Sequence, residues 1–156
     1  MGKNTLYQKI ANLPIKGFAL GSSPPQPAGN YVAVKKVGNT AYVSGQMSVF
    51  SSGETLKRPN IVNISFGYEA AKLAMAQAFK QLLYCEEINE IDSILRIDGY
   101  FCHEHGKNLP KMLDGASDLV AELFESEKST HARTVFGVAA LPYNAFVEVV
   151  VIAEVS

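Results

Sequence analysis

Apolar and polar residues recur along the chain with two different periods, and these periods divide it into strands and helices. Runs with strand character are Tyr31–Val37, Thr40–Gln46, Ser93–His103, Thr134–Ala140 and Ala145–Val155. Apolar positions three or four residues apart predict helices over Leu6–Leu13, Phe66–Tyr84 and Lys111–Phe124. Two long helices, each followed by strands, favour an α+β domain in which a mixed β-sheet carries both helices on one face.

Turn residues indicate how these elements are connected. Gly38-Asn39 joins the first two strands as a hairpin. Pro142, Tyr143 and Asn144 separate the last two strands, so the chain is expected to end in a second hairpin. The short first helix and the breaker-rich loop Gly21–Gly29 form an N-terminal extension, residues 1–30, of a single domain spanning residues 1–156.

Two charged residues stand out in the apolar C-terminal segment. Arg133 lies where its first strand begins, and Glu148 interrupts the second. A charge inside a buried strand is costly unless another group pairs with it. Arg133 therefore either pairs with Glu148, or with an acid of a neighbouring subunit, or binds a carboxylate ligand through its guanidinium fork. Glu148 either orients Arg133 or activates a water molecule as a general base.

Composition narrows the function classes. The net charge is −1 and the basic residues are scattered, which does not favour a nucleic-acid-binding surface. Cys85 and Cys102 form no CxxC motif and are expected to be free thiols in a reducing compartment. No apolar run has the length of a membrane span, and the N-terminus lacks the pattern of a signal peptide, so we expect a cytoplasmic protein.

Cys102-His103-Glu104-His105 is the one pattern that suggests a metal site. Histidines two apart on an extended strand share a face, but no third ligand lies nearby in sequence. We interpret His103 and His105 as solvent-exposed residues at a strand end and predict no metal. Phosphate-binding glycine motifs and the GxSxG nucleophile motif do not occur.

Several short motifs together resemble the YjgF/RidA family, also called the L-PSP endoribonuclease-like family. They are Gly29-Asn30-Tyr31, Gly38-Asn39, Val43-Ser44-Gly45-Gln46, Ala132-Arg133-Thr134, Leu141-Pro142 and Val147-Glu148. The similarity spans nearly the whole chain. The short N-terminal helix, the Gly115–Asp118 segment and His131 are closer to the longer branch of the family, which has roughly 150 residues.

The resemblance implies a chorismate-mutase-like α+β fold assembled as a homotrimer with clefts between subunits. Its members hydrolyse enamine and imine intermediates such as 2-aminoacrylate to a 2-keto acid and ammonia, without a metal or organic cofactor. By this resemblance Arg133 grips the substrate carboxylate, Tyr31 and Ser44 line the pocket, and Glu148 places or activates the attacking water. A reactive imine needs only positioning and water activation.

Two positions depart from the best-known members of the family. Val135 stands where they have a cysteine, and the region near Gly115–Ala116 offers no counterpart to an asparagine of the last helix. Two other functions therefore remain: a non-catalytic protein that binds small carboxylates, which needs Arg133 but not Glu148, and the endoribonuclease activity of the family name. An RNA-binding groove should show clustered Lys and Arg with aromatic platforms, and this sequence shows none.

Overall fold

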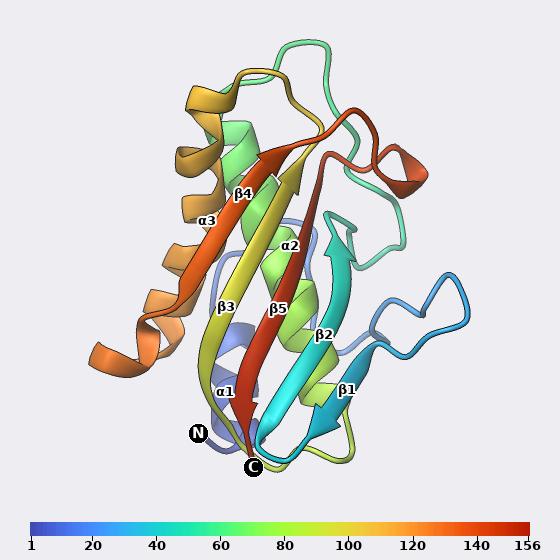
Figure 1. Ribbon diagram of the computed structural model, residues 1–156. Coiled ribbons are helices and arrows are strands. Elements are labelled where there is room, and N and C mark those ends of the chain that lie inside the picture. Colours follow the sequence, from blue (N-terminus) through green and yellow to red (C-terminus); the bar gives the residue numbers. More distant parts are fainter.

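The computed structural model describes residues 1–156 and contains a five-stranded sheet with helices on one face (Figure 1). The strands are β1 (Val34–Val37), β2 (Thr40–Met47), β3 (Ile91–Phe101), β4 (Ala132–Gly137) and β5 (Val147–Val155). They lie in the order β1-β2-β5-β3-β4. β3 and β4 are parallel, and the other neighbouring strands are antiparallel. This mixed sheet confirms the predicted α+β class.

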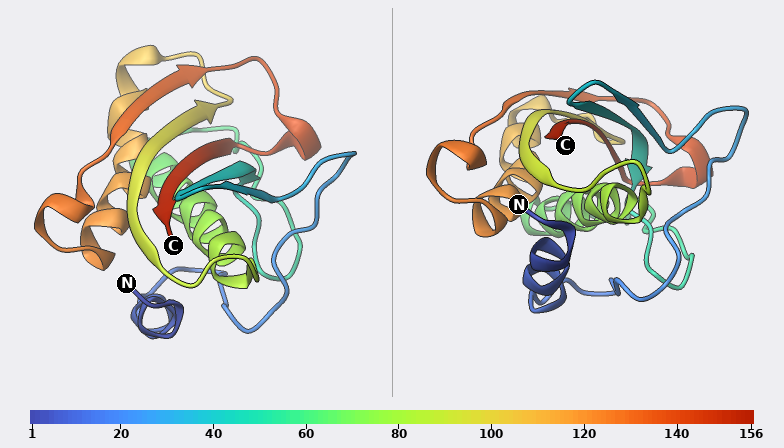
Figure 2. Two further views of the ribbon diagram at one scale, coloured as in Figure 1. Left: turned by 60° about the horizontal axis from the view of Figure 1, so that its bottom comes forward. Right: turned by 90° about the horizontal axis from the view of Figure 1, so that it is seen from below.

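The helices form two layers beneath the sheet. α2 (Ile64–Tyr84) lies against β2 and β5, and α3 (Leu109–Leu123) lies against β3 and β4. α1 (Lys3–Ala11) packs on α2 and α3, on the side away from the sheet (Figure 2). The prediction of two helices on one face is confirmed, with α1 as an additional layer. Even α2, the longest helix, lacks the continuous apolar stretch that a membrane-spanning helix needs.

Strict alternation along β5 explains why the helices cover only one face. Its odd-numbered residues are fully or almost fully buried and belong to the hydrophobic core: Val147, Val149, Val151, Ala153 and Val155. The even-numbered residues between them, Glu148 to Glu154, point to the other face and are partly or fully exposed. The sheet therefore has one face packed on α2 and α3 and one open face.

The first two helices each begin two or three residues before the predicted start. α2 begins after Asn63, whose Oδ1 accepts a hydrogen bond from the Phe66 N–H at 2.8 Å. α1 begins at Lys3, before the predicted start at Leu6. The N-terminal ammonium donates to the Ile91 carbonyl at 3.1 Å, and Gly2 bridges to Glu90. These two contacts fix Met1 and Gly2 beside the start of β3, and the helix begins directly after them.

The predicted C-terminal hairpin is wrong. β4 and β5 are not neighbours, because β3 runs between them and pairs with both. The β3–α3–β4 segment is a parallel crossover, so β4 ends at the same end of the sheet as β3. The connection through Pro142–Asn144 then crosses the end of β3, and Tyr143 and Asn144 there have φ of 57° and 56°. The turn residues were recognised, but they span a strand instead of closing a hairpin.

Polar side chains on the second half of α2 hold the long loop that precedes β1. Lys80 is fully buried, and its Nζ donates to the Ala19 carbonyl at 2.8 Å and to Ser22 Oγ at 2.6 Å. Burial lowers the pKa of this amine. Gln81 donates to the Pro25 carbonyl at 2.6 Å, and Tyr84 donates to the Leu20 carbonyl at 2.7 Å. α2 thus fixes the segment that leads to Tyr31.

Close approach of α2 and α3 depends on Gly115, and its replacement by alanine tests this packing. A Cβ on Gly115 would overlap the backbone carbonyl of Tyr68, which cannot move without displacing α2. Alanine normally stabilises a helix interior by about 1 kcal/mol relative to glycine. Here we expect Gly115→Ala to lower the free energy of unfolding by about 1–3 kcal/mol, as overpacking does. Urea denaturation measures it.

Gly106→Ala is the control, because nothing lies within 4 Å of a Cβ at that position. It should leave the urea midpoint nearly unchanged. A Gly115→Ala protein as stable as the wild type would show that the two helices do not pack as closely as described.

Candidate functional site

Glu148 lies on the open face of the sheet and packs its carboxylate against the backbone of β2. It pairs in register with Met47 on β2 and with Tyr100 on β3. The carboxylate fills the space beside Gly45, where a Cβ would overlap Oε1. Burial raises the pKa of the Glu148 carboxyl above its ordinary value. No salt bridge involves Glu148. Because its pKa is raised, the Glu148 carboxylate binds a proton more readily than an exposed glutamate does.

A β-bulge in β2 creates the surroundings of this carboxylate. The register with β5 shifts between Val43 and Gln46, so Ser44 and Gly45 together oppose one residue. Ser44 Oγ donates to the Val32 carbonyl at 2.7 Å, and its lone pairs can still accept from a ligand. The bulge therefore places Gly45 against the Glu148 carboxylate, and Ser44 ties β2 to the loop before β1.

Tyr31 stands next to this bulge, in the loop before β1 instead of in the predicted strand. Its side chain is exposed, and its hydroxyl oxygen accepts a hydrogen bond from the Ala28 N–H at 3.2 Å. Tyr31, Gly45 and Met47 line a cavity of about 340 Å³ together with loop residues 25–28. We call Tyr31, Ser44, Gly45 and Glu148 the glutamate cluster.

Arg133 lies at the other edge of the sheet, on β4, and reaches α3. Its Nη1 donates to Asp114 Oδ1 at 2.8 Å and to Ser117 Oγ at 3.0 Å. Its Nη2 donates to the Pro110 carbonyl at 3.1 Å. Three of the five N–H groups of the guanidinium are therefore bound within the chain. Nε–H and the second Nη2–H have no hydrogen-bond partner within the chain.

The hydrogen bonds around Arg133 extend to His131. Ser117 Oγ lies 2.9 Å from His131 Nε2, and His131 Nδ1 lies 3.2 Å from the Ser129 carbonyl. A proton on Nδ1 satisfies both contacts, because Nδ1–H then donates to the carbonyl and Nε2 accepts from the serine hydroxyl. We call Arg133, Asp114, Ser117 and His131 the arginine cluster.

Sequence reasoning missed three members of the arginine cluster. Asp114, Ser117 and His131 are not among the site residues that the sequence predicts. Their spacing carried usable information: residues three apart share a helix face, and residues two apart share a strand face. Asp114 with Ser117, and His131 with Arg133, fit these spacings. Without knowing that α3 covers β4, the two pairs could not be combined.

The structure separates Arg133 from Glu148. Tyr100 pairs with both Phe136 on β4 and Glu148 on β5, so these three residues share the open face. Arg133 is three residues from Phe136 and points to the helix-covered face. The Arg133–Glu148 ion pair considered from the sequence is therefore not formed, and the acid that pairs with Arg133 is Asp114 of the same chain.

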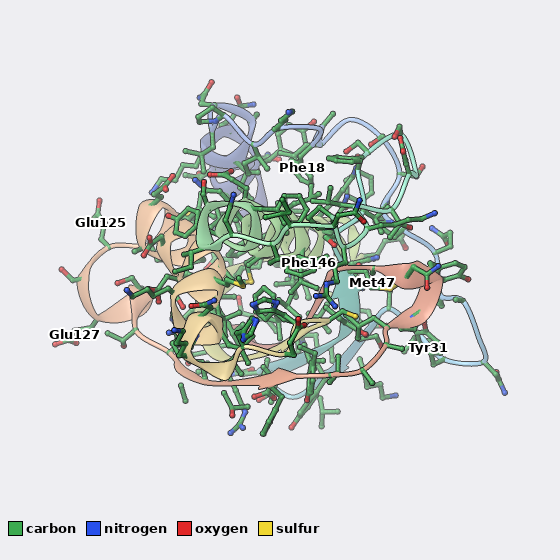
Figure 3. All side chains as sticks on the ribbon, turned by 90° about the horizontal axis from the view of Figure 1, so that it is seen from above. Phe18, Tyr31, Met47, Glu125, Glu127 and Phe146 are labelled. Carbon is green, nitrogen blue, oxygen red and sulfur yellow. The ribbon has the colours of Figure 1, made fainter.

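The two clusters are separated along the strand order of the sheet. The arginine cluster is at the β4 edge, and the glutamate cluster lies on β5, β2 and the loop before β1. β5 and β3 run between β2 and β4, which places these strands about 14 Å apart at the usual strand spacing. Figure 3 shows Tyr31 and Met47 on one side and, on the other, Glu125 and Glu127 of the connection that leads from α3 to β4. One copy of the chain therefore does not bring Arg133 together with Tyr31, Ser44 and Glu148.

The two positions that depart from the family pattern now have structural explanations. Val135 lies on the same strand face as Arg133 and packs against the hydrophobic core. Gly115 faces the backbone of α2 and not β4. The residues of α3 that face Arg133 are Asp114 and Ser117, so the polar groups of this region come from positions beside the one expected.

His103 differs from its sequence interpretation. It was expected in solvent at a strand end, but it is only 6% exposed. β3 ends at Phe101, and the chain then turns so that the His103 N–H donates to the Phe101 carbonyl at 2.8 Å, which directs the ring inward. Burial lowers the pKa of the His103 imidazole. No group of three or more His, Cys, Asp or Glu side chains is arranged to hold a metal ion.

The raised pKa of Glu148 can be tested through Gly45. A Cβ at position 45 should push the flexible carboxylate towards solvent, so we expect the pKa of Glu148 to fall back towards the ordinary value in Gly45→Ala. Carboxyl ¹³C NMR titration of both proteins measures this shift, and Glu148→Gln identifies the resonance by its loss. An unchanged titration in Gly45→Ala would contradict the described contact.

Comparison with known proteins gives a consistent assignment. A family model described as "YjgF/chorismate mutase-like, putative endoribonuclease" matches residues 17–155. The chain is 28% identical over 133 residues to the 2-iminobutanoate/2-iminopropanoate deaminase of Dermatophagoides farinae, covering 80% of this chain and 85% of that protein. The crystal structure of Atu1372 from Agrobacterium tumefaciens, a protein of unknown function, has a TM-score of 0.81 at 26% identity, covering 99% of this chain and 94% of that one. The structure of TdcF from E. coli with bound serine has a TM-score of 0.61 at 20% identity, with 85% and 94% covered. The chain belongs to the YjgF/chorismate-mutase-like (YjgF/RidA) family and has its fold.

Proposed function

We propose that this protein hydrolyses small enamine or imine intermediates that carry a carboxylate, such as 2-aminoacrylate, to a 2-keto acid and ammonia. The observation that carries the proposal is the held guanidinium of Arg133, which keeps two N–H groups free on neighbouring nitrogens. A carboxylate accepts two parallel hydrogen bonds from such a pair of donors. The deaminase relative supports the same class of substrate, and the serine bound to TdcF is also a small carboxylate.

Glu148 is the group best suited to activate water. The carbon of the protonated imine is attacked by a water oxygen while the Glu148 carboxylate accepts one water proton, which gives a neutral carbinolamine. Glu148 then returns this proton to the nitrogen, and the C–N bond breaks as ammonia leaves. The carbinolamine hydroxyl gives its proton back to the Glu148 carboxylate as the C=O bond of the keto acid forms, and this proton passes to the released ammonia as ammonium. A carboxyl whose pKa is raised by burial is a better base for this task than an exposed one. Tyr31 lines the adjacent cavity with Gly45, the residue that the Glu148 carboxylate packs against. We assign Ser44, which precedes Gly45 in the bulge, to the same binding region.

The separation of the two clusters supports a site that is shared between copies of the chain. β1 and β4 are the two edges of the sheet. The arginine cluster lies at the β4 edge, and the glutamate cluster extends from the central strand β5 across β2 to the loop before β1. A cyclic oligomer places one edge of a subunit beside the opposite edge of the next. We propose that a homotrimer of this kind joins the arginine cluster of one subunit to the glutamate cluster of its neighbour. The free cysteines Cys85 and Cys102 are compatible with action in the cytoplasm.

The proposal is tested with 2-aminoacrylate generated in situ by an excess of a lyase acting on serine, with pyruvate formation followed by a coupled dehydrogenase. We expect the protein to accelerate pyruvate formation over buffer. Arg133→Ala should lower kcat/KM by at least about 100-fold, because two charge-assisted hydrogen bonds are lost. Arg58→Ala is the matched control, since Arg58 is an exposed arginine that also pairs with a carboxylate, that of Glu104. It should retain activity within about twofold.

Two outcomes would contradict the proposal in different ways. If the wild-type protein does not accelerate the reaction, it does not hydrolyse 2-aminoacrylate. Pyruvate binding that requires Arg133 but not Glu148 would then indicate a non-catalytic carboxylate-binding protein. Full activity in Arg133→Ala would show that the anchor is assigned to the wrong residue.

A further inference from the structure

We propose that Ser117 and His131 are positioning residues, which hold the Arg133 guanidinium in the orientation that binds a carboxylate. This inference rests on the proposed role of Arg133 as the anchor. Neither Ser117 nor His131 needs to touch the ligand. They act through Arg133.

Because Asp114 pairs with Arg133, binding of a carboxylate depends on the orientation of the Arg133 guanidinium. With Asp114 Oδ1 at 2.8 Å from Nη1, the arginine is already paired with an opposite charge. The pair carries little net charge, so it attracts an anion only weakly from a distance. Affinity for a carboxylate must then come from directional hydrogen bonds to Nε–H and Nη2–H. These bonds are strong only when the planar guanidinium is held in the correct plane.

The three acceptors that hold this plane all lie on α3. Pro110 and Asp114 contact the guanidinium from the first half of α3. Ser117, one turn later, accepts from Nη1 at 3.0 Å, and it is the only one of the three acceptors whose own position depends on a further side chain. His131 fixes the serine hydroxyl through Nε2, and its Nδ1 is fixed by the Ser129 carbonyl. The chain of bonds therefore runs from the backbone before β4, through two side chains, to the anchor.

In this series of hydrogen bonds, Ser117 Oγ contacts both His131 Nε2 and Arg133 Nη1. The serine hydroxyl donates to His131 Nε2 and accepts from Arg133 Nη1, so its rotation is fixed from both sides. Removing His131 would free the hydroxyl to rotate, and removing Ser117 would free one N–H of Nη1. Both changes should loosen the guanidinium while leaving the charged pair of Arg133 and Asp114 in place.

The test measures binding of pyruvate, the keto acid product of 2-aminoacrylate hydrolysis, by calorimetry or NMR titration. We expect Ser117→Ala and His131→Phe each to raise the Kd by about tenfold, the effect of about 1.4 kcal/mol in lost hydrogen bonding. Ser117→Thr keeps the hydroxyl and should restore binding close to that of the wild type. Thr130→Ala is the control in the same connection, because the Thr130 hydroxyl donates to the Glu127 carbonyl and takes no part in these bonds.

Two further readouts separate positioning from a general structural effect. In an Arg133→Ala background, Ser117→Ala should have no additional effect on the Kd, because residues that act through one another are not additive. In enzyme assays, Ser117→Ala should raise KM with little change in kcat. The Nε–H NMR resonance of Arg133 should report a less restricted guanidinium in Ser117→Ala and His131→Phe than in Thr130→Ala.

The outcomes are distinguishable from failure of the proposed function. If the wild type binds pyruvate through Arg133 but Ser117→Ala binds equally well, the positioning role is wrong and the anchor stands. Additive effects of Ser117→Ala and Arg133→Ala would also overturn the positioning role. If Arg133→Ala binds pyruvate as tightly as the wild type, or if the wild type does not bind it, both the anchor and its positioning residues are wrong.

Discussion

The insertion of β3 between the two C-terminal strands determines where all the candidate chemistry lies. β3 pairs with β4 in parallel and with β5 in antiparallel orientation, so it keeps Arg133 at the sheet edge and Glu148 near its centre. The parallel pair requires the crossover through α3, and α3 is the element that contacts Arg133. A C-terminal hairpin would have put the two charges on adjacent strands. The observed topology gives each charge a separate environment.

These environments suit different tasks. Arg133 is surrounded by hydrogen-bond acceptors that fix it, and it is paired with Asp114. Glu148 has no ion-pair partner and is partly withdrawn from water, against a glycine that leaves room for its carboxylate. A fixed cation suits recognition of a carboxylate, and an unpaired, partly buried acid suits proton transfer. The proposed imine substrate is already reactive, so it needs orientation by the cation and a base, but no covalent nucleophile.

The sequence predicted the elements and the fold class well, because alternation along β5 and helical spacing along α2 and α3 are strong patterns. It also indicated the hairpin at Gly38-Asn39, where Gly38 has φ of 56°. It failed on the neighbours of β4, since turn residues at Pro142–Asn144 do not reveal whether a strand lies between the segments they join. The contacts of Asp114, Ser117 and His131 with Arg133 depend on that topology, so no local pattern could give them. Burial of His103 likewise follows from a turn after Phe101 that composition does not signal.

The central claim is that one site is built from the arginine cluster of one subunit and the glutamate cluster of the next. Its most direct test mixes two inactive variants, Arg133→Ala and Glu148→Gln, by co-expression, with mixed oligomers verified by native mass spectrometry. Random assembly in equal amounts gives interfaces with both intact residues, and we expect about one quarter of wild-type activity to return. Mixed oligomers that remain as inactive as either variant alone would contradict a site shared between subunits.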